Sequence, residues 1–343
     1  MNAHSHSLAQ TRPVIRFLIP AAIAWFGWSL LGSQTFAQES IFAAGSKPVE
    51  LIKTGAKEGP AWHPAHGLFS SGTEGITLTS PSETAKLFLP DAGTNGLLID
   101  NAGSLLMCRQ QFRNVGRLDL NTGKLTVLTK DYQGKQYNTP NDITTDSKGR
   151  IYFSDPRYGD RQSMEMIDAD GRAIEGVYRI DLDGTVTRII THQVDRPNGV
   201  LVSPDDKYLY VADNHNNTVG GARKLFRFDL DAQGNPIADS QRLIFDWHSG
   251  RGPDGLTIDT LGRLYVAGGR NVAKPPFETA DQFLGGVYVL SPAGKLLQFL
   301  PINRDEVTNC TFGGDDLKTL YITAGGSLWS IRTRAPGVKP SEQ

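Results

Sequence analysis

The segment GPDGLTIDTLGRLYVAGG (residues 252–269) has the pattern of a β-hairpin with a carboxylate at its entrance. Leu256 and Ile258 alternate with polar residues, as in a strand with one buried face, and a turn leads to a second apolar strand around Tyr265. Asp254 stands just ahead of the first strand, where an unpaired charge beside a core would be costly. The segment therefore raises the question of what neutralises this carboxylate.

The same pattern recurs along the chain, and its recurrence predicts the fold. A polar residue, an apolar strand, a turn rich in Gly, Asp or Lys and a second strand follow one another in five further segments. These are EGPAWHPAHGLFSSG from Glu58, NGLLIDNAGSLLMCR from Asn95, NDITTDSKGRIYFSD from Asn141, NGVLVSPDDKYLYVAD from Asn198 and NCTFGGDDLKTLYIT from Asn309. The six starting residues are 37, 46, 57, 56 and 55 residues apart, a period typical of repeat architectures.

Each interval also contains a second pair of strands. The segment GVYRIDLDGTVTRII (residues 176–190), for example, has two alternating strands around an Asp-Gly turn. Two hairpins per repeat give a four-stranded antiparallel sheet, and six such sheets around one axis form an all-β, six-bladed β-propeller. A parallel β-helix is the competing architecture, but its repeats are shorter and need no four-stranded unit. We expect one propeller domain over residues 45–333 and a loose polar tail over residues 334–343.

Residues 1–37 are predicted to be a secretory signal peptide. Arg12 and Arg16 precede the apolar run FLIPAAIAWFGWSLLG, and Thr35 and Ala37 supply the small residues of a cleavage site. An uncleaved membrane anchor is the alternative, because the run is about the shortest that could span a bilayer. The flanking residues favour export to a periplasm or to the cell exterior, with cleavage after Ala37 and no stable membrane insertion afterwards.

Charge and cysteine content narrow the range of partners. The net charge of −1 gives no basic excess of the kind that a nucleic-acid-binding surface needs, so no nucleic-acid partner is expected. Cys108 and Cys310 could pair in an oxidising compartment, but one pair makes no disulfide framework, and buried free thiols are the preferred interpretation. The sequence predicts no particular oligomeric state.

The polar residues that begin the six repeats are candidate functional residues. The first strand of each propeller blade lines the central channel, so residues at equivalent positions converge near one mouth. The six residues all carry a side-chain oxygen, and they are Glu58, Asn95, Asn141, Asn198, Asp254 and Asn309. Oxygen donors without thiolates or imidazoles suit a hard divalent cation such as calcium. A bound cation would also remove the repulsion between Glu58 and Asp254, which would answer the question posed by the opening segment.

Local turn chemistry is the alternative explanation for each of these residues taken singly. Asn and Asp ahead of a strand often hydrogen-bond to their own backbone in Asx-turns. Six oxygen-bearing residues at one phase of the repeat are harder to explain in this way, and turn chemistry does not require Glu58.

Five segments together resemble the gluconolactonase and senescence-marker-protein (regucalcin) family of six-bladed propellers. They are KEGPAWHP, TPNDITTDSKGRIYFSDPRYG, RPNGVLVSPDDKYLYVAD, GPDGLTIDTLGRLYVAGG and TNCTFGGDDLKTLYIT, in this order along nearly the whole chain that follows the signal. The resemblance implies a catalytic calcium ion held by Glu58, Asn141, Asn198 and Asp254, with zinc or magnesium as other candidate ions. It further implies that Asp254 acts as the acid/base residue.

The residues expected to face the substrate are Asn95, Arg109, Tyr158, His215 and Asn309. The family pattern has a Glu-His pair where this chain has Arg109 and a glutamine, and it has a proline where this chain has an arginine before Tyr158. These departures leave the sugar preference open. An anionic substrate would explain both arginines, as would ordinary solvated surface positions.

Hydrolysis of a sugar lactone such as gluconolactone is the reaction most compatible with these residues. A carboxylate beside a cation is a weak base and needs an activated ester, which a strained lactone provides. Three alternatives stay open: a calcium-dependent esterase or phosphoesterase, a non-enzymatic ligand-binding propeller, and a quinone-dependent sugar oxidoreductase. The chain has no Gly-x-Ser-x-Gly elbow of a serine hydrolase and no histidine spacing typical of a metal motif.

Overall fold

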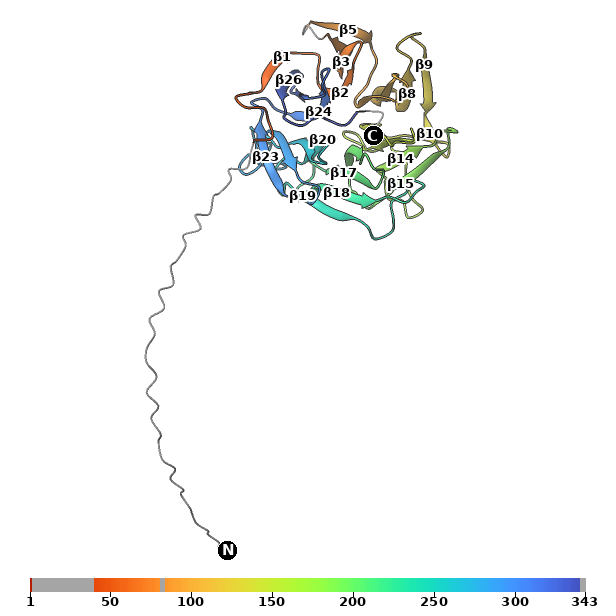
Figure 1. Ribbon diagram of the computed structural model, residues 1–343. Helices are drawn as coiled ribbons and strands as arrows, with labels where there is room; N and C mark the ends of the chain where they lie inside the picture. Colours follow the sequence, from red (N-terminus) through yellow and green to blue (C-terminus); the bar gives the residue numbers. More distant parts are fainter. Residues whose placement is uncertain (2–39, 81–83, 340–343) are drawn as a thin grey trace, which may run out of the picture. The chain divides into compact units, whose positions relative to one another are not determined.

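Six four-stranded antiparallel sheets are arranged as the blades of a propeller (Figure 1), which confirms the predicted all-β fold. The computed structural model describes Met1 and residues 40–80 and 84–339. The predicted signal peptide, apart from Met1, and the last four residues of the predicted tail lie outside the described residues.

Five blades each consist of four consecutive strands, and the first strand of each blade contacts the first strands of its neighbours. Blade 1 contains β2 (Glu58–His63), β3 (Gly67–Ser71), β4 (Gly75–Thr79) and β5 (Ala85–Pro90). Blade 2 contains β6 (Leu97–Ile99), β7 (Leu105–Arg109), β8 (Asn114–Leu118) and β9 (Leu125–Thr129). Blade 3 contains β12 (Ile143–Thr145), β13 (Ile151–Asp155), β14 (Gly176–Ile180) and β15 (Val186–Ile190).

The next two blades repeat this order. Blade 4 contains β16 (Pro197–Val202), β17 (Tyr208–Asn214), β18 (Arg223–Asp229) and β19 (Arg242–Asp246). Blade 5 contains β20 (Pro253–Ile258), β21 (Leu264–Gly268), β22 (Gly286–Leu290) and β23 (Leu296–Pro301). Outside the blades, β10 (Asp131–Tyr132) pairs with β11 (Lys135–Gln136), and the short 3-10 helix η1 (Gln110–Phe112) connects β7 and β8.

Blade 6 combines the two ends of the propeller sequence. From the channel outward it contains β24 (Val307–Gly313), β25 (Thr319–Ala324) and β26 (Ser327–Arg332), and its outer strand is β1 (Val49–Ile52). β1 pairs antiparallel with β26, with Glu50 opposite Trp329. The first strand of the propeller thus closes the ring onto the last.

A buried aspartate organises the turn of the hairpin in the opening segment. Asp259 Oδ1 accepts the backbone N–H groups of Leu261 and Arg263, each at 3.0 Å. Its Oδ2 accepts Arg263 Nε at 2.6 Å and the hydroxyl of Tyr265 at 3.0 Å. The same cluster in blade 3 is formed by Asp146, Arg150 and Tyr152. The repeated letters Asp-x-x-Gly-Arg-x-Tyr therefore encode a turn whose side chains satisfy its own backbone.

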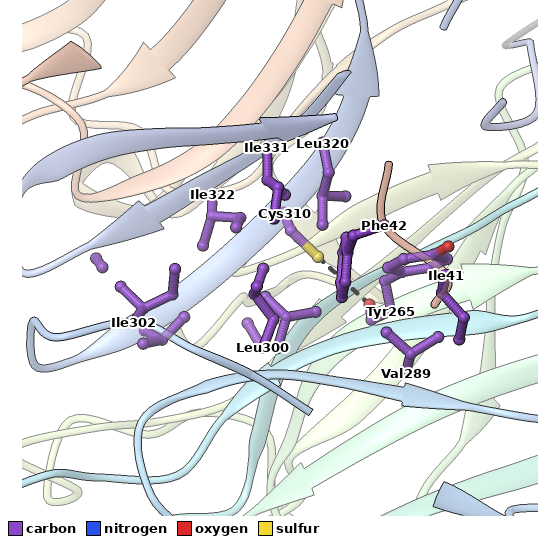
Figure 2. Packing of buried hydrophobic residues seen from close by; sticks show 14 of the residues in the cluster. Ile41, Phe42, Tyr265, Val289, Leu300, Ile302, Cys310, Leu320, Ile322 and Ile331 are labelled. Atoms are coloured by element: carbon purple, nitrogen blue, oxygen red, sulfur yellow. Dashed lines mark hydrogen bonds between the residues drawn. The ribbon is translucent and has the colours of Figure 1, made fainter. Parts of the chain in front are cut away.

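Apolar side chains pack between adjacent blades. Figure 2 shows the cluster between blades 5 and 6, in which Tyr265 of β21 lies near Cys310 of β24. The Cys310 sulfur lies 3.3 Å from the carbonyl oxygen of Tyr265. Ile41 and Phe42, which precede β1, belong to the same cluster, so the packed unit begins ahead of residue 45.

Cys108 and Cys310 are both free and buried, in line with the interpretation of both as free thiols.

The segment after residue 333 differs from the loose tail expected. Ala335 and Val338 are only 9% and 8% exposed, and Val338 N–H donates to the carbonyl of Ile258. Its few apolar residues were sufficient to dock it at the end of an inner strand. None of the helices in the described part of the chain has the length and apolarity to cross a membrane.

Candidate functional site at one mouth of the channel

The six residues that begin the repeats lie at the same level of the propeller, where the inner strands start, and are called the ring below. Glu58 opens β2, Asn198 and Asp254 are the second residues of β16 and β20, and Asn309 is the third residue of β24. Asn95 and Asn141 come two residues before β6 and β12. Sequence phase therefore predicted a shared position in the fold for residues from six different blades.

Hydrogen bonds connect this level from blade to blade. The N–H of Gly96 in blade 2 donates to the carbonyl of Asn141 in blade 3 at 2.6 Å. The hydroxyl of Ser154 in blade 3 donates to the carbonyl of Asn198 in blade 4 at 2.5 Å. These bonds fix the backbone that carries the two asparagines relative to the neighbouring blades.

Glycines after two of the predicted ligands allow neighbouring inner strands to approach closely. A Cβ at Gly199 would lie 2.1 Å from the carbonyl oxygen of Asp254, and one at Gly255 would lie 2.0 Å from Cγ of Asn309. Any side chain at either position would force the strands apart. The Asn-Gly and Asp-Gly pairs in the sequence thus bring Asn198, Asp254 and Asn309 together.

Two buried aspartates shape the loops that carry Asn141 and Asn198. The Asp155 carboxylate accepts two backbone N–H groups, each at 2.8 Å, from the loop before Asn141. The Asp213 carboxylate accepts two from the loop before Asn198, at 2.9 and 3.0 Å. Burial raises the pKa of Asp155 to about 7 and that of Asp213 to about 6, although these N–H bonds act in the opposite direction.

The carboxyl groups of the partly buried Glu58 and of the buried Asp142 and Asp254 influence one another. Burial raises the pKa of Glu58 well above its usual range, and the charges of Asp254 and Asp142 raise it further. Burial also raises the pKa of Asp142 to about 7. For Asp254 burial is again the largest cause, and the pKa rises to about 6 although Arg251 lowers it. Each of these groups is therefore costly to ionise without a nearby positive charge.

Asp254 is held in place by hydrogen bonds from two residues. Arg251 Nη2 donates to Asp254 Oδ2 at 2.6 Å, and the two side chains are 6% and 4% exposed. Hydrogen bonding by Asn198 also lowers the pKa of Asp254. The Asn198 amide nitrogen donates to the Tyr158 hydroxyl at 3.0 Å, and that hydroxyl donates to the carbonyl of Asn214 at 3.1 Å. Because the Asn198 nitrogen is engaged in this way, its amide oxygen remains available to coordinate a cation.

A second group of charged residues adjoins Asp254. Arg251 Nη1 lies 3.3 Å from Glu306 Oε2 and 3.8 Å from Glu278 Oε1. Arg270 contacts Glu278 Oε2 at 3.0 Å and also pairs with Glu306. Together with the three carboxyl groups of Glu58, Asp142 and Asp254, this makes five carboxyl groups and two guanidinium groups, so the acidic groups outnumber these basic groups.

The donor set fits a hard divalent cation. In the described part of the chain, Glu58 accepts a single hydrogen bond, at 3.3 Å from the N–H of Gly59. No group of three or more His, Cys, Asp and Glu side chains in residues 40–80 and 84–339 is placed to hold a metal ion. The predicted set contains only two carboxylates, so the amide oxygens of Asn141 and Asn198 would have to complete it. Oxygen donors of this kind, in a cluster short of positive charge, suit calcium or magnesium.

Two of the residues expected to face the substrate are engaged beside the ring. The Asn95 amide nitrogen donates to Gln110 Oε1 at 3.0 Å. Asn309 Oδ1 accepts the N–H of Cys310 at 2.8 Å, and its nitrogen lies 3.5 Å from Asp142 Oδ1. Asn309 therefore supports a buried carboxylate, whereas Asn95 joins the ring to η1.

Two others have their described contacts away from the three carboxyl groups. The Arg109 guanidinium lies over the ring of Phe112, 4.2 Å from its centroid. His215 Nε2 hydrogen-bonds to Thr218 Oγ1 at 2.7 Å, and burial, followed by the charge of Arg196, lowers the pKa of His215. A direct role for either residue in substrate binding stays a prediction.

Sequence reasoning did not identify Asp142, Arg251, Glu278 or Glu306 as parts of this site. Asp142 directly follows Asn141, and Arg251 stands three residues before Asp254, so the sequence places both beside predicted ligands. Glu278 and Glu306 lie in loops of irregular length, and no repeat position marked them.

The chain is similar to proteins named as lactonases. It is 28% identical over 317 residues to the gluconolactonase of Zymomonas mobilis, covering 85% of this chain and 83% of that protein. It is 26% identical over 285 residues to pentonolactonase XacC of Haloferax volcanii, covering 78% and 81%. The solved structure of XC5397 from Xanthomonas campestris, described as a gluconolactonase, has a TM-score of 0.70 at 29% identity and covers 85% of this chain and 91% of that one.

The family follows from the extent of the match. Residues 56–326 match the SMP-30/gluconolactonase/LRE-like region, which spans the blades from the start of the first inner strand to the hairpin of the last. The protein belongs to the SMP-30/gluconolactonase/LRE-like family of six-bladed β-propellers.

Proposed function

We propose that the protein is a calcium-dependent lactonase that hydrolyses a sugar lactone such as gluconolactone. Its relatives named gluconolactonase and pentonolactonase support hydrolysis of a lactone ester bond. The observation that carries the proposal is the group of oxygen donors around Glu58, Asp142 and Asp254, whose carboxyl groups all have raised pKa values.

Glu58, Asn141, Asn198 and Asp254 would hold the ion. When bound, a divalent cation would polarise the lactone carbonyl and stabilise the negative charge that develops on its oxygen. Tyr158 would act by holding the nitrogen of Asn198, so that the amide oxygen stays directed to the ligand. Zinc or magnesium are alternatives to calcium that the test below separates.

Asp254 would be the acid/base residue. Because Arg251 binds Oδ2, the orientation of the Asp254 carboxylate is fixed. A water molecule adds to the carbonyl carbon while Asp254 takes its proton, and the ring C–O bond then breaks as that proton passes to the leaving oxygen. The product is the open-chain hydroxy acid.

The substrate would enter at the mouth where the inner strands begin. Asn95, Tyr158 and Asn309 lie at or beside this level, and Arg109 and His215 remain candidates for contact with more distant substrate groups. We also propose that the protein is exported to a periplasm or to the cell exterior, on the strength of the sequence over residues 1–37.

The test is a hydrolysis assay with the mature protein that begins after Ala37. Glucono-1,5-lactone is the substrate, and activity is measured before chelation, after chelation and after addition of calcium, magnesium or zinc. We expect chelation to abolish activity and calcium to restore it. Activity that persists unchanged in chelator, or that favours aryl esters or organophosphates over the lactone, would contradict the proposal.

A further inference from the structure

Arg251 is a buried cation in contact with Asp254, which in the proposed function also binds the divalent ion. Its residue is 5% exposed, and its guanidinium contacts Asp254 at 2.6 Å, Glu306 at 3.3 Å and Glu278 at 3.8 Å. Its Nε is buried without a hydrogen-bond partner in the described part of the chain. Arg251 is therefore more than a partner for one carboxylate, because it joins the ring to the acidic residues beside it.

We propose that Arg251 is a positioning residue that fixes one oxygen of Asp254 and weakens the affinity of the ring for its divalent cation. This inference rests on the proposed function. The contact at Oδ2 fixes the orientation of the Asp254 carboxylate, and it places a positive charge next to the ring. Like charges repel most strongly where water is excluded, so the guanidinium opposes a second cation in its neighbourhood.

Glu306 acts in the opposite sense. It contacts Nη1 of Arg251, whereas Asp254 contacts Nη2. The Glu306 side chain is 36% exposed, whereas that of Glu278 is fully buried. The Glu306 carboxylate offsets part of the Arg251 charge. Removal of the negative charge of Glu306 should therefore make the ring less attractive to a cation, and removal of the positive charge of Arg251 should make it more attractive.

A purely structural role for Arg251 has a different outcome. If the residue served only to neutralise buried carboxylates, its loss would lower stability and disorder the ring, and both changes would weaken calcium binding. An increase in calcium affinity is an outcome that loss of packing does not produce.

The experiment compares four variants of the chain that begins after Ala37. Arg251→Met removes the charge, Arg251→Lys keeps it, and Glu306→Gln removes the opposing carboxylate. Arg263→Met is the matched control, because Arg263 pairs with Asp259 in the same blade at 2.6 Å but has no contact with the ring in the described residues. Calcium alone is titrated into the chelated proteins by calorimetry, and kcat and KM are measured at saturating calcium.

We expect Arg251→Met to bind calcium at least about tenfold more tightly and Glu306→Gln to bind it several-fold more weakly. Arg251→Lys should stay near the wild-type affinity. At saturating calcium, kcat of Arg251→Met should fall about tenfold or more with little change in KM, because Asp254 loses its fixed orientation. Arg263→Met should melt at a lower temperature and keep the wild-type calcium affinity.

Three results would overturn the inference. One is a folded Arg251→Met that binds calcium no more tightly than the wild type while the wild type remains a calcium-dependent lactonase; the proposed function would survive. If Arg251→Met does not fold, the sign of the Glu306→Gln effect decides, and unchanged or tighter binding by that variant overturns it. Absence of calcium binding and of lactone hydrolysis in the wild type would remove the proposed function and this inference together.

Discussion

At the scale of single residues, the carboxylate of Asp254 shows how burial and pairing act against each other. Burial is the largest influence and raises its pKa, whereas the charge and hydrogen bond of Arg251 lower it, with a result of about 6. Without a bound ion the group is thus largely ionised near neutral pH. A bound cation would lower its pKa further and make it a weaker base, which suits an activated ester such as a lactone.

Asp254→Asn keeps the size of the side chain and removes the proton acceptor. We expect kcat for glucono-1,5-lactone to fall by about a thousandfold. Asp316→Asn is the control, because Asp316 pairs with Arg332 at the exposed edge of blade 6, where the two side chains are 50% and 47% exposed. Circular dichroism should show both variants folded, and near-normal turnover by Asp254→Asn would exclude this residue as the base.

The residues that could be predicted from sequence are those that occupy a fixed phase of the repeat. Asn198 and Asp254 are recognisable because each stands at the start of an inner strand and is followed by a glycine that the neighbouring blade requires. Arg251 and Glu306 could not be paired in this way. Their contact depends on how two loops from different blades fold over the channel mouth, and loop geometry leaves no periodic trace.

At the scale of elements, the Asp-x-x-Gly-Arg-x-Tyr hairpins of blades 3 and 5 are held by one aspartate each. The carboxylate of Asp259 satisfies two backbone N–H groups of the turn, a guanidinium and a phenol hydroxyl. Without this carboxylate, the part-buried donors of the turn and the buried Tyr265 hydroxyl would lose their acceptor, and an unpaired buried donor costs more than a hydrogen bond contributes.

Asp259→Ala should therefore destabilise the protein without touching the ring. Loss of one partner from a buried ion pair leads us to expect about 3 kcal/mol less free energy of unfolding. Asp183→Ala is the control, because Asp183 lies in an exposed turn of blade 3 where it accepts one backbone N–H, from Thr185, at 2.9 Å. Denaturant titrations measure the free energy of unfolding of both variants. An equal decrease in the two would show that the Asp259 cluster contributes no more stability than the exposed turn.

The hairpins were predictable because alternation and turn residues are local signals. β1 and the docked segment after β26 were not predicted, since each is too short to show a period and each is stabilised by residues distant in sequence. Phe42 bridges to Thr333, and Val338 reaches Ile258. Only the assembled ring supplies these partners.

At the scale of the whole molecule, buried carboxyl groups tie stability to pH. Burial raises the pKa of Asp142 and Asp155 to about 7 and that of Asp213 to about 6. Between about pH 4 and pH 7 the folded protein therefore binds more protons than the unfolded chain. The free energy of unfolding is greatest at the acid end of this window and falls as the pH rises through it.

The chelated protein should accordingly melt at a higher temperature at about pH 5 than at about pH 7.5. Calcium should raise the melting temperature more at the higher pH, because protons and the ion compete for carboxyl groups in and beside the ring. Differential scanning calorimetry with and without chelator measures both effects. A melting temperature that rises steadily across this window in chelator would contradict the pKa shifts of the buried aspartates.

The pairing of β1 with β26 sets the order in which the molecule can be completed. β1 leaves the ribosome before any other strand of the propeller, yet its partner is the last strand to be made. Until then the nascent chain carries an unpaired edge at each end, and the earlier blades can form only an open arc. A circularly permuted chain that placed β1 directly after β26 would let the sixth blade assemble from one continuous stretch. In the wild-type order this blade forms only when both ends of the propeller sequence meet.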